Sequence, residues 1–136
     1  MTNSGKIKNY DVQSVNIQAS TSKVFDYIAN PTNLPKWTGA FKDADDKSAL
    51  LTTPNGELKI GLTTKTNKEL GIIDWHMTMP DGSVGVAYSR VVANADGNAI
   101  YSFILLAPPA PIEEVEGALL QQMEILKKNY KIYRRF

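Results

Sequence analysis

The stretch from residue 40 to 107 constrains the fold most, because it alternates strand-like segments with tight turns. The turn sequences PNG (54–56), PDG (80–82) and NADGN (94–98) combine the residues that favour hairpin turns. The segments between them read ALLTT, ELKIGLTTKT, LGIIDWHMTM, SVGVAYSRVVA and AIYSFILLA. Short apolar strands at regular spacing predict an antiparallel meander. The charged segment KDADDK leaves open one further short edge strand.

The residues before the meander predict one strand and two short helices. VQSVNIQAS alternates apolar and polar residues, which is typical of a strand with Val15, Ile17 and Ala19 facing inward. Ser20 is a good N-cap for a helix over 21–29 with an apolar stripe. Proline ends that helix after Asn30, and PTNLPKW predicts a short helical turn that places Leu34 and Trp37 against the core.

The residues after the meander predict a long helix. PPAP (108–111) ends the strand pattern, and apolar residues then recur at three- and four-residue intervals from Ile112 to Tyr133. Acidic residues gather at the start of this segment and basic ones at its end, which favours a helix through its dipole. The basic segment KKNYKIYRR is explained by that dipole, so we do not take it as a membrane or nucleic-acid site.

Composition limits the class of protein. The chain has 136 residues, a net charge of +1 and no cysteine. We expect a single domain over 1–136, with a flexible stretch over 1–9. The near-zero charge argues against a nucleic-acid partner, and no apolar run approaches the ~20 residues of a membrane span. No signal sequence is apparent, so we expect a cytoplasmic location without membrane insertion. One histidine and no cysteine leave no usual zinc site, and no cofactor motif is present.

The order of these segments, with VFDYIANPTNLPKWTGAF, LGIIDWHMTMPDG and SRVVANADGNAIYSFIL in sequence, resembles the SRPBCC or helix-grip superfamily. Within it the chain is similar to the polyketide cyclase/dehydrase-like branch, related to START domains and pollen allergens. The resemblance covers about residues 10 to 134. It implies an α+β fold: a curved antiparallel sheet of six to seven strands around a long C-terminal helix, with two short helices after the first strand. A single helix cannot fill the concave face, so we expect a ligand cavity between sheet and helix.

Alternation assigns the residues that line this cavity. On residues 72–79 one face is apolar, and we expect it to point inward. On residues 84–92 the larger side chains favour Tyr88 and Arg90 as inward, although Arg90 could instead reach solvent. Tyr88, Arg90 and Tyr101 are the catalytic candidates, if there is catalysis. The predicted ligand-binding residues are Phe25, Trp37, Leu58, Ile60, Ile73, Trp75, Met77, Met79, Tyr88, Arg90, Tyr101, Phe103, Leu119 and Met123.

Asp74 and His76 form the one acid–histidine pair of the sequence. They share a strand face, but it is the face opposite Trp75 and Met77. A general base must lie within hydrogen-bond reach of its substrate. We therefore expect the pair on the surface, and a homodimer contact there stays open.

Three functions are consistent with these features. The first is binding of a small hydrophobic or aromatic ligand, lipid- or polyketide-like, in the cavity. The second, implied by the resemblance, is a cyclase, aromatase or dehydrase that uses the same cavity. The third is a regulatory protein-interaction module.

Overall fold

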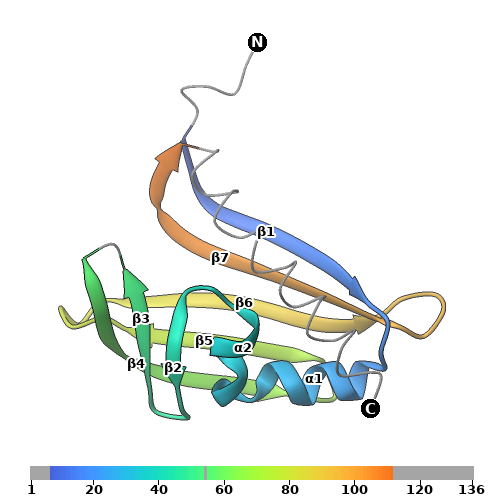
Figure 1. The fold of residues 1–136 in the computed structure, drawn as a ribbon. Helices are drawn as coiled ribbons and strands as arrows, with labels where there is room; N and C mark the ends of the chain where they lie inside the picture. The colour runs from blue at the N-terminus through green and yellow to red at the C-terminus, as the bar shows by residue number, and fades with distance from the viewer. Residues whose placement is uncertain (1–6, 54, 112–136) are drawn as a thin grey trace.

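The computed structural model describes residues 7–53 and 55–111, which form one antiparallel sheet and two short helices (Figure 1). The elements are β1 (Ile7–Ile17), α1 (Thr21–Ala29), the 3₁₀ turn η1 (Pro31–Asn33), α2 (Leu34–Trp37), β2 (Phe41–Ala44), β3 (Ser48–Thr53), β4 (Gly56–Asn67), β5 (Ile72–Thr78), β6 (Val84–Ala93) and β7 (Ala99–Pro111). The strand order is β1-β7-β6-β5-β4-β3-β2, with every neighbouring pair antiparallel. The predicted meander is therefore confirmed, including the edge strand β2.

The two helices form for the reasons that the sequence indicates. The Ser20 side chain accepts a hydrogen bond from the backbone N–H of Lys23 at 3.3 Å and caps α1. The Asn30 side chain caps η1 in the same way, through the N–H of Thr32. α1 contacts β5, β6 and β7, and α2 contacts β2, so both helices cover the same face of the sheet. We call this the inner face.

Strand alternation builds the core on the inner face. Residues of one parity on each strand are buried, while their neighbours are half-buried or exposed. Paired inner residues run across the sheet in rows; Val15, Tyr101 and Val91 form one such row, from β1 through β7 to β6. The largest inner side chains with their helical partners are Val24, Phe25, Ile28, Leu34, Trp37, Ile60, Leu62, Ile73, Trp75, Tyr101 and Phe103.

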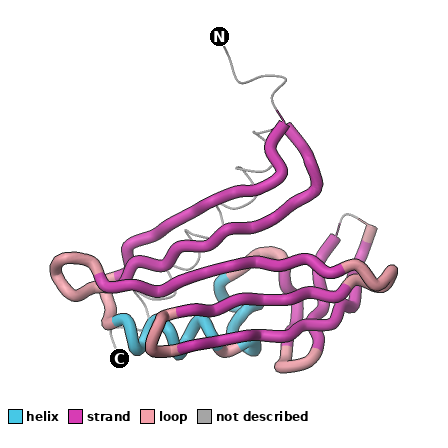
Figure 2. Tube along the Cα trace, turned by 180° about the vertical axis from the view of Figure 1, so that it is seen from behind, coloured by secondary structure: helices cyan, strands magenta, loops and turns pink. Residues whose placement is uncertain are grey.

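β7 is longer than predicted. We expected PPAP to end the strand pattern, but β7 continues to Pro111, and its last residues pair with β1. β6 pairs with β7 only as far as Leu105, so β1 and β7 run on beyond β6 as an antiparallel pair of strands (Figures 1 and 2). Along that stretch β7 has β1 as its neighbour among the described strands, and a strand with one hydrogen-bonding neighbour tolerates proline. β1 likewise begins at Ile7, earlier than the first alternating residues suggest.

The predicted faces of β6 are wrong. Ala87, Ser89 and Val91 are buried on the inner face, whereas Tyr88 and Arg90 are exposed on the other. Side-chain size predicts the bulkier set as inward, but Ala87 lies opposite Trp75 on β5, where the neighbouring indole already fills the space. The predicted C-terminal helix, with Leu119 and Met123, lies outside the described residues.

Candidate ligand-binding site

Four aromatic rings meet on the inner face. Trp37 comes from α2, Trp75 from β5, and Tyr101 and Phe103 from β7. The ring of Trp37 lies 5.9 Å from that of Trp75 and 5.9 Å, edge-on, from that of Tyr101. Tyr101 in turn stacks on Phe103 at 5.8 Å. We call these four residues the aromatic cluster; flat apolar surfaces of this kind suit an aromatic or polycyclic ligand.

The aromatic cluster carries three buried polar atoms that form no hydrogen bond within the described part of the chain. Nε1 of Trp37, Nε1 of Trp75 and the hydroxyl oxygen of Tyr101 have no hydrogen-bond partner among the described residues. Thr38 and Thr64 each add a hydroxyl in the same condition. A buried, unpaired donor costs about 1–3 kcal/mol, so such groups are few in folded proteins. Their gathering around one cluster marks it as a place where a bound molecule could supply the missing acceptors.

The environment of Tyr101 keeps its hydroxyl protonated. Burial raises the pKa of Tyr101 far above the ordinary 10.0, since the phenolate would be removed from water. The side chain of Ser89 acts in the opposite direction and lowers the pKa of Tyr101, but burial is the larger cause. Tyr101 is therefore a neutral hydrogen-bond donor at physiological pH.

A buried carboxylate lies on the same face, and the sequence-based prediction of the site did not include it. Asp11 is 1% exposed and accepts a hydrogen bond from Gln13 Nε2 at 3.1 Å. Asp11 pairs with Leu105, and Gln13 pairs with Phe103 of the aromatic cluster. The signal was present, because alternation from Val15 back toward the N-terminus places both residues on the inner face.

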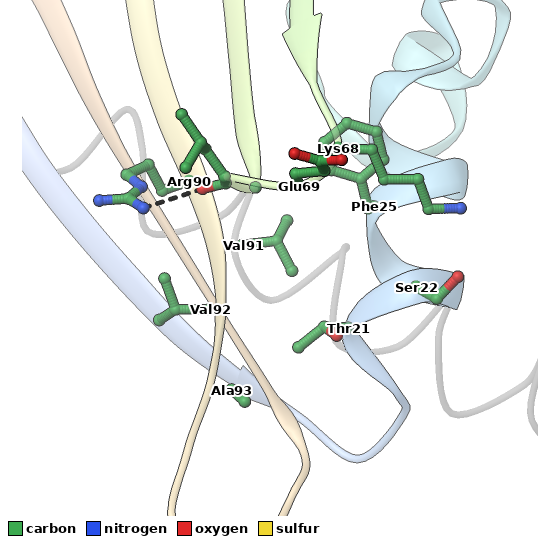
Figure 3. Close-up of a pocket in the computed structure, with 11 residues that line it drawn as sticks. Thr21, Ser22, Phe25, Lys68, Glu69, Arg90, Val91, Val92 and Ala93 are labelled. Carbon is green, nitrogen blue, oxygen red and sulfur yellow. Dashed lines mark hydrogen bonds between the residues drawn. The ribbon is translucent and has the colours of Figure 1, made fainter.

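A second feature is a pocket of about 460 Å³ beside α1 (Figure 3). Its walls are the start of α1, the turn between β4 and β5, and the end of β6. Phe25 and Val91 line it and also belong to the buried core, with Val91 directly opposite Tyr101. The pocket therefore reaches the periphery of the aromatic cluster.

Polar contacts fix the turn that borders this pocket. Lys68 forms an ion pair with Asp26 of α1 at 2.8 Å. Arg90 donates to the carbonyl of Leu70 at 2.8 Å and points away from Phe25 and Val91 (Figure 3). Arg90 therefore lines the pocket, as predicted for a residue near the cavity, but its guanidinium bonds the turn and does not face the aromatic cluster.

The structure places most of the other predicted residues on the inner face. Phe25, Trp37, Ile60, Ile73, Trp75, Tyr101 and Phe103 are buried, and Leu58, Met77 and Met79 are half-buried against the same core. Tyr88, 44% exposed, does not join them. Asp74 and His76 lie half-buried on the outer face, as expected, and Asp74 accepts a hydrogen bond from the N–H of Ser89.

Two further features of the described part of the chain concern metals and membranes. No group of three or more histidine, cysteine, aspartate or glutamate side chains is placed to hold a metal ion there. Nor does any helix in residues 7–53 and 55–111 have the length and apolar character needed to cross a bilayer.

Comparison with known proteins defines the fold. No protein-family model and no curated protein matches the chain. Among solved structures, a START superfamily protein from Mycobacterium smegmatis matches with a TM-score of 0.72 and 9% identity, over 93% of this chain and 99% of that one. The di-domain ARO/CYC protein BexL of the BE-7585A biosynthetic pathway matches with a TM-score of 0.69 and 11% identity, over 91% of this chain and 47% of that one. A protein from Nitrosospira multiformis matches with a TM-score of 0.66 and 16% identity, over 93% and 99% of the two chains.

The chain therefore has a START-like fold, which it shares with the domains of polyketide aromatase/cyclases, as the resemblance implied. Matches at 9–16% identity show a shared fold, but they do not indicate which ligand this chain binds.

Proposed function

We propose that the protein binds a small hydrophobic or aromatic molecule that carries hydrogen-bond acceptor oxygens. The observation that supports this most is the set of buried donors on Trp37, Trp75 and Tyr101, which have no acceptor among residues 7–53 and 55–111 and belong to rings in mutual contact. A purely apolar ligand would leave these donors unsatisfied, whereas a carbonyl or ether oxygen would accept from them. The START-like and aromatase/cyclase neighbours are consistent with a small molecule on this face of the sheet.

Two contributions to the binding free energy favour such a ligand. Removing apolar ligand surface from water contributes about 25 cal/mol per Å² before the costs of association. Each hydrogen bond to a donor that is already desolvated adds about 0.5–1.5 kcal/mol, because the protein has no water to give up at that atom. The half-buried Met77 and Met79 border the same core and can adapt to ligand shape.

A matched pair of ligands tests the proposal. Fluorenone and fluorene share a flat aromatic frame, and only fluorenone carries a carbonyl oxygen. We expect fluorenone to bind about 2- to 12-fold more tightly, which corresponds to one hydrogen bond. The Tyr101→Phe variant should lose part of this preference while binding fluorene unchanged, as measured by calorimetric titration.

The control is Tyr88→Phe, which removes the same hydroxyl from the outer face of the sheet. It should leave both affinities unchanged. Equal binding of fluorenone and fluorene by the unaltered protein would contradict the role of the donors, and binding of neither would contradict the inner site itself.

A cyclase-type enzyme is the second candidate, and Asp11 is the observation that favours it. A carboxyl group that is 1% exposed on the inner face could take a proton from a bound poly-keto chain. Turnover of a linear poly-keto substrate analogue, lost in Asp11→Asn with binding retained, would support the enzyme. If the analogue is recovered unchanged, the enzyme candidate is contradicted and ligand binding is the one proposed function that remains.

A further inference from the structure

The outer face of the sheet carries an apolar patch that the inner site does not use. Seven large apolar side chains of β1, β6 and β7 are between 38% and 58% exposed. We call them the outer patch: Tyr10, Val12, Val84, Tyr88, Val92, Ile104 and Leu106. Single exposed apolar residues are ordinary, but a group on adjoining strands marks an interaction surface.

The strand register brings five members of the outer patch together. Val12 pairs with Ile104, and Ile104 pairs with Tyr88, so the three lie side by side in one row across the sheet. Tyr10 pairs with Leu106 in the next row. Side chains directly opposite on antiparallel strands lie about 4.5–5.5 Å apart at Cβ, which is within contact distance.

Charge is segregated along the same rows. The row of Tyr88 continues onto Asp74 of β5 and then Lys65 of β4. On β1, β6 and β7, by contrast, Arg90 is the one charged outward side chain among those that the structure describes. The outer face is therefore charged over β4 and β5. Over β1, β7 and β6 its apolar residues lie on both sides of one polar row, formed by Ser14, Ser102 and Arg90.

We propose that the outer patch is the contact through which two copies of this chain associate, sheet face on sheet face. Half-exposed tyrosines contribute roughly 100 Å² each and half-exposed aliphatic side chains roughly 50 Å² each, together about 450 Å². One side of a homodimer interface of standard size buries about 800 Å², of which about 65% is apolar. The outer patch thus supplies nearly the apolar area that such a dimer requires of each subunit.

The charge of the chain also suits self-association. A net charge of +1 produces little repulsion between two copies. Arg90, the one charged outward side chain that the structure describes on these three strands, gives little attraction for a charged partner or an anionic membrane. Beside the outer patch lie one acidic residue, Asp74, and one basic residue, Lys65. Two copies can therefore meet without like charges facing each other along the whole edge of the patch.

Sedimentation velocity over a range of protein concentrations tests the proposal. The unaltered protein should form dimers, and Val12→Glu and Ile104→Glu should each raise the dimer dissociation constant by about tenfold or more, because each buries an unpaired carboxylate. Thr63→Glu is the matched control: Thr63 is exposed, on the polar half of the outer face opposite His76, and should leave the dimer unchanged. Thermal unfolding of each variant separates dissociation from loss of the fold.

The absence of cysteine allows a second measurement. Single-cysteine variants at Val12 and Tyr88 should cross-link as dimers with a bifunctional maleimide, whereas Thr63→Cys should not. A protein that stays monomeric up to about 100 µM, well above the micromolar range of standard interfaces, would overturn the proposal. So would a dimer that Val12→Glu and Ile104→Glu leave intact, or a monomer that binds lipid vesicles through the outer patch.

Discussion

At Gly71, the turn between β4 and β5 requires a residue without a side chain. Its φ is +70°, and a Cβ placed there would lie 2.1 Å from the carbonyl oxygen of Val91. The N–H of Val91 donates to the Gly71 carbonyl at 2.8 Å, so the two backbones cannot move apart without losing a hydrogen bond. Close approach of two strands, rather than turn geometry alone, makes glycine necessary here.

Replacing Gly71 therefore tests the packing of this turn. We expect Gly71→Ala to lower the free energy of unfolding by more than the ~1–2 kcal/mol of left-handed backbone strain, because the clash adds to it. Gly97→Ala is the control, since Gly97 has a φ of +84° and open space around the missing Cβ. Urea unfolding of both variants should show the larger loss for Gly71→Ala, and equal losses would contradict the close approach.

Tyr101 predicts a specific loss of stability in alkali. Its pKa is raised by burial in the folded state, so above about pH 10 the unfolded chain releases a proton that the folded chain keeps. The contribution of Tyr101 to stability is thus complete below pH 10 and declines as the pH rises above it. Tyr101→Phe should unfold with a shallower alkaline decline than the unaltered protein, while Tyr88→Phe should follow the unaltered curve.

The residues also show where sequence patterns mislead. On β5 only one face is apolar, so alternation assigned Ile73 and Trp75 to the interior correctly. On β6 both faces are apolar, because the outer one carries Val84, Tyr88 and Val92 of the outer patch. Size is then the only guide, and it predicts the wrong face, because the large neighbour Trp75 leaves room for only Ala87 opposite it on the inner face.

At the scale of elements, α1 depends on its first residue as well as its apolar stripe. α1 has nine residues, and a helix this short is marginal without a cap and tertiary contacts. We expect Ser20→Ala to lower the free energy of unfolding by about 1 kcal/mol, because the Lys23 N–H loses its acceptor. Ser22→Ala, an exposed change in the first turn, should be neutral within about 0.5 kcal/mol; a loss equal to that of Ser20→Ala would contradict the capping role.

Elements were predicted best where local chemistry decides them. The turns, the capped helix α1, the proline-bounded α2 and the meander from β2 to β7 follow from residues close together in the chain. The extension of β7 through PPAP does not, because it depends on β1, about 100 residues away, and on the absence of β6 beside it among the described strands. Long-range pairing of this kind leaves no local pattern.

At the scale of the whole molecule, the sheet separates two surfaces with different properties. The inner face gathers aromatic rings and unpaired donors around Trp37, Trp75 and Tyr101. The outer face carries the outer patch on one half and charges on the other. The sequence predicted the aromatic residues of the inner face. It could not predict that their N–H and O–H groups would be buried without an acceptor among the described residues, because that depends on the three-dimensional packing.

The most direct measurement of the central claim uses the two tryptophans, which give the chain two indole N–H signals. Nitrogen-15 correlation spectra would follow the Nε1–H signals of Trp37 and Trp75 during titration with fluorenone. We predict saturable downfield proton shifts of these signals, because each N–H that gains an acceptor oxygen is deshielded, and smaller shifts with fluorene. Saturable binding that leaves both indole signals in place would contradict the assignment of the ligand site to the aromatic cluster.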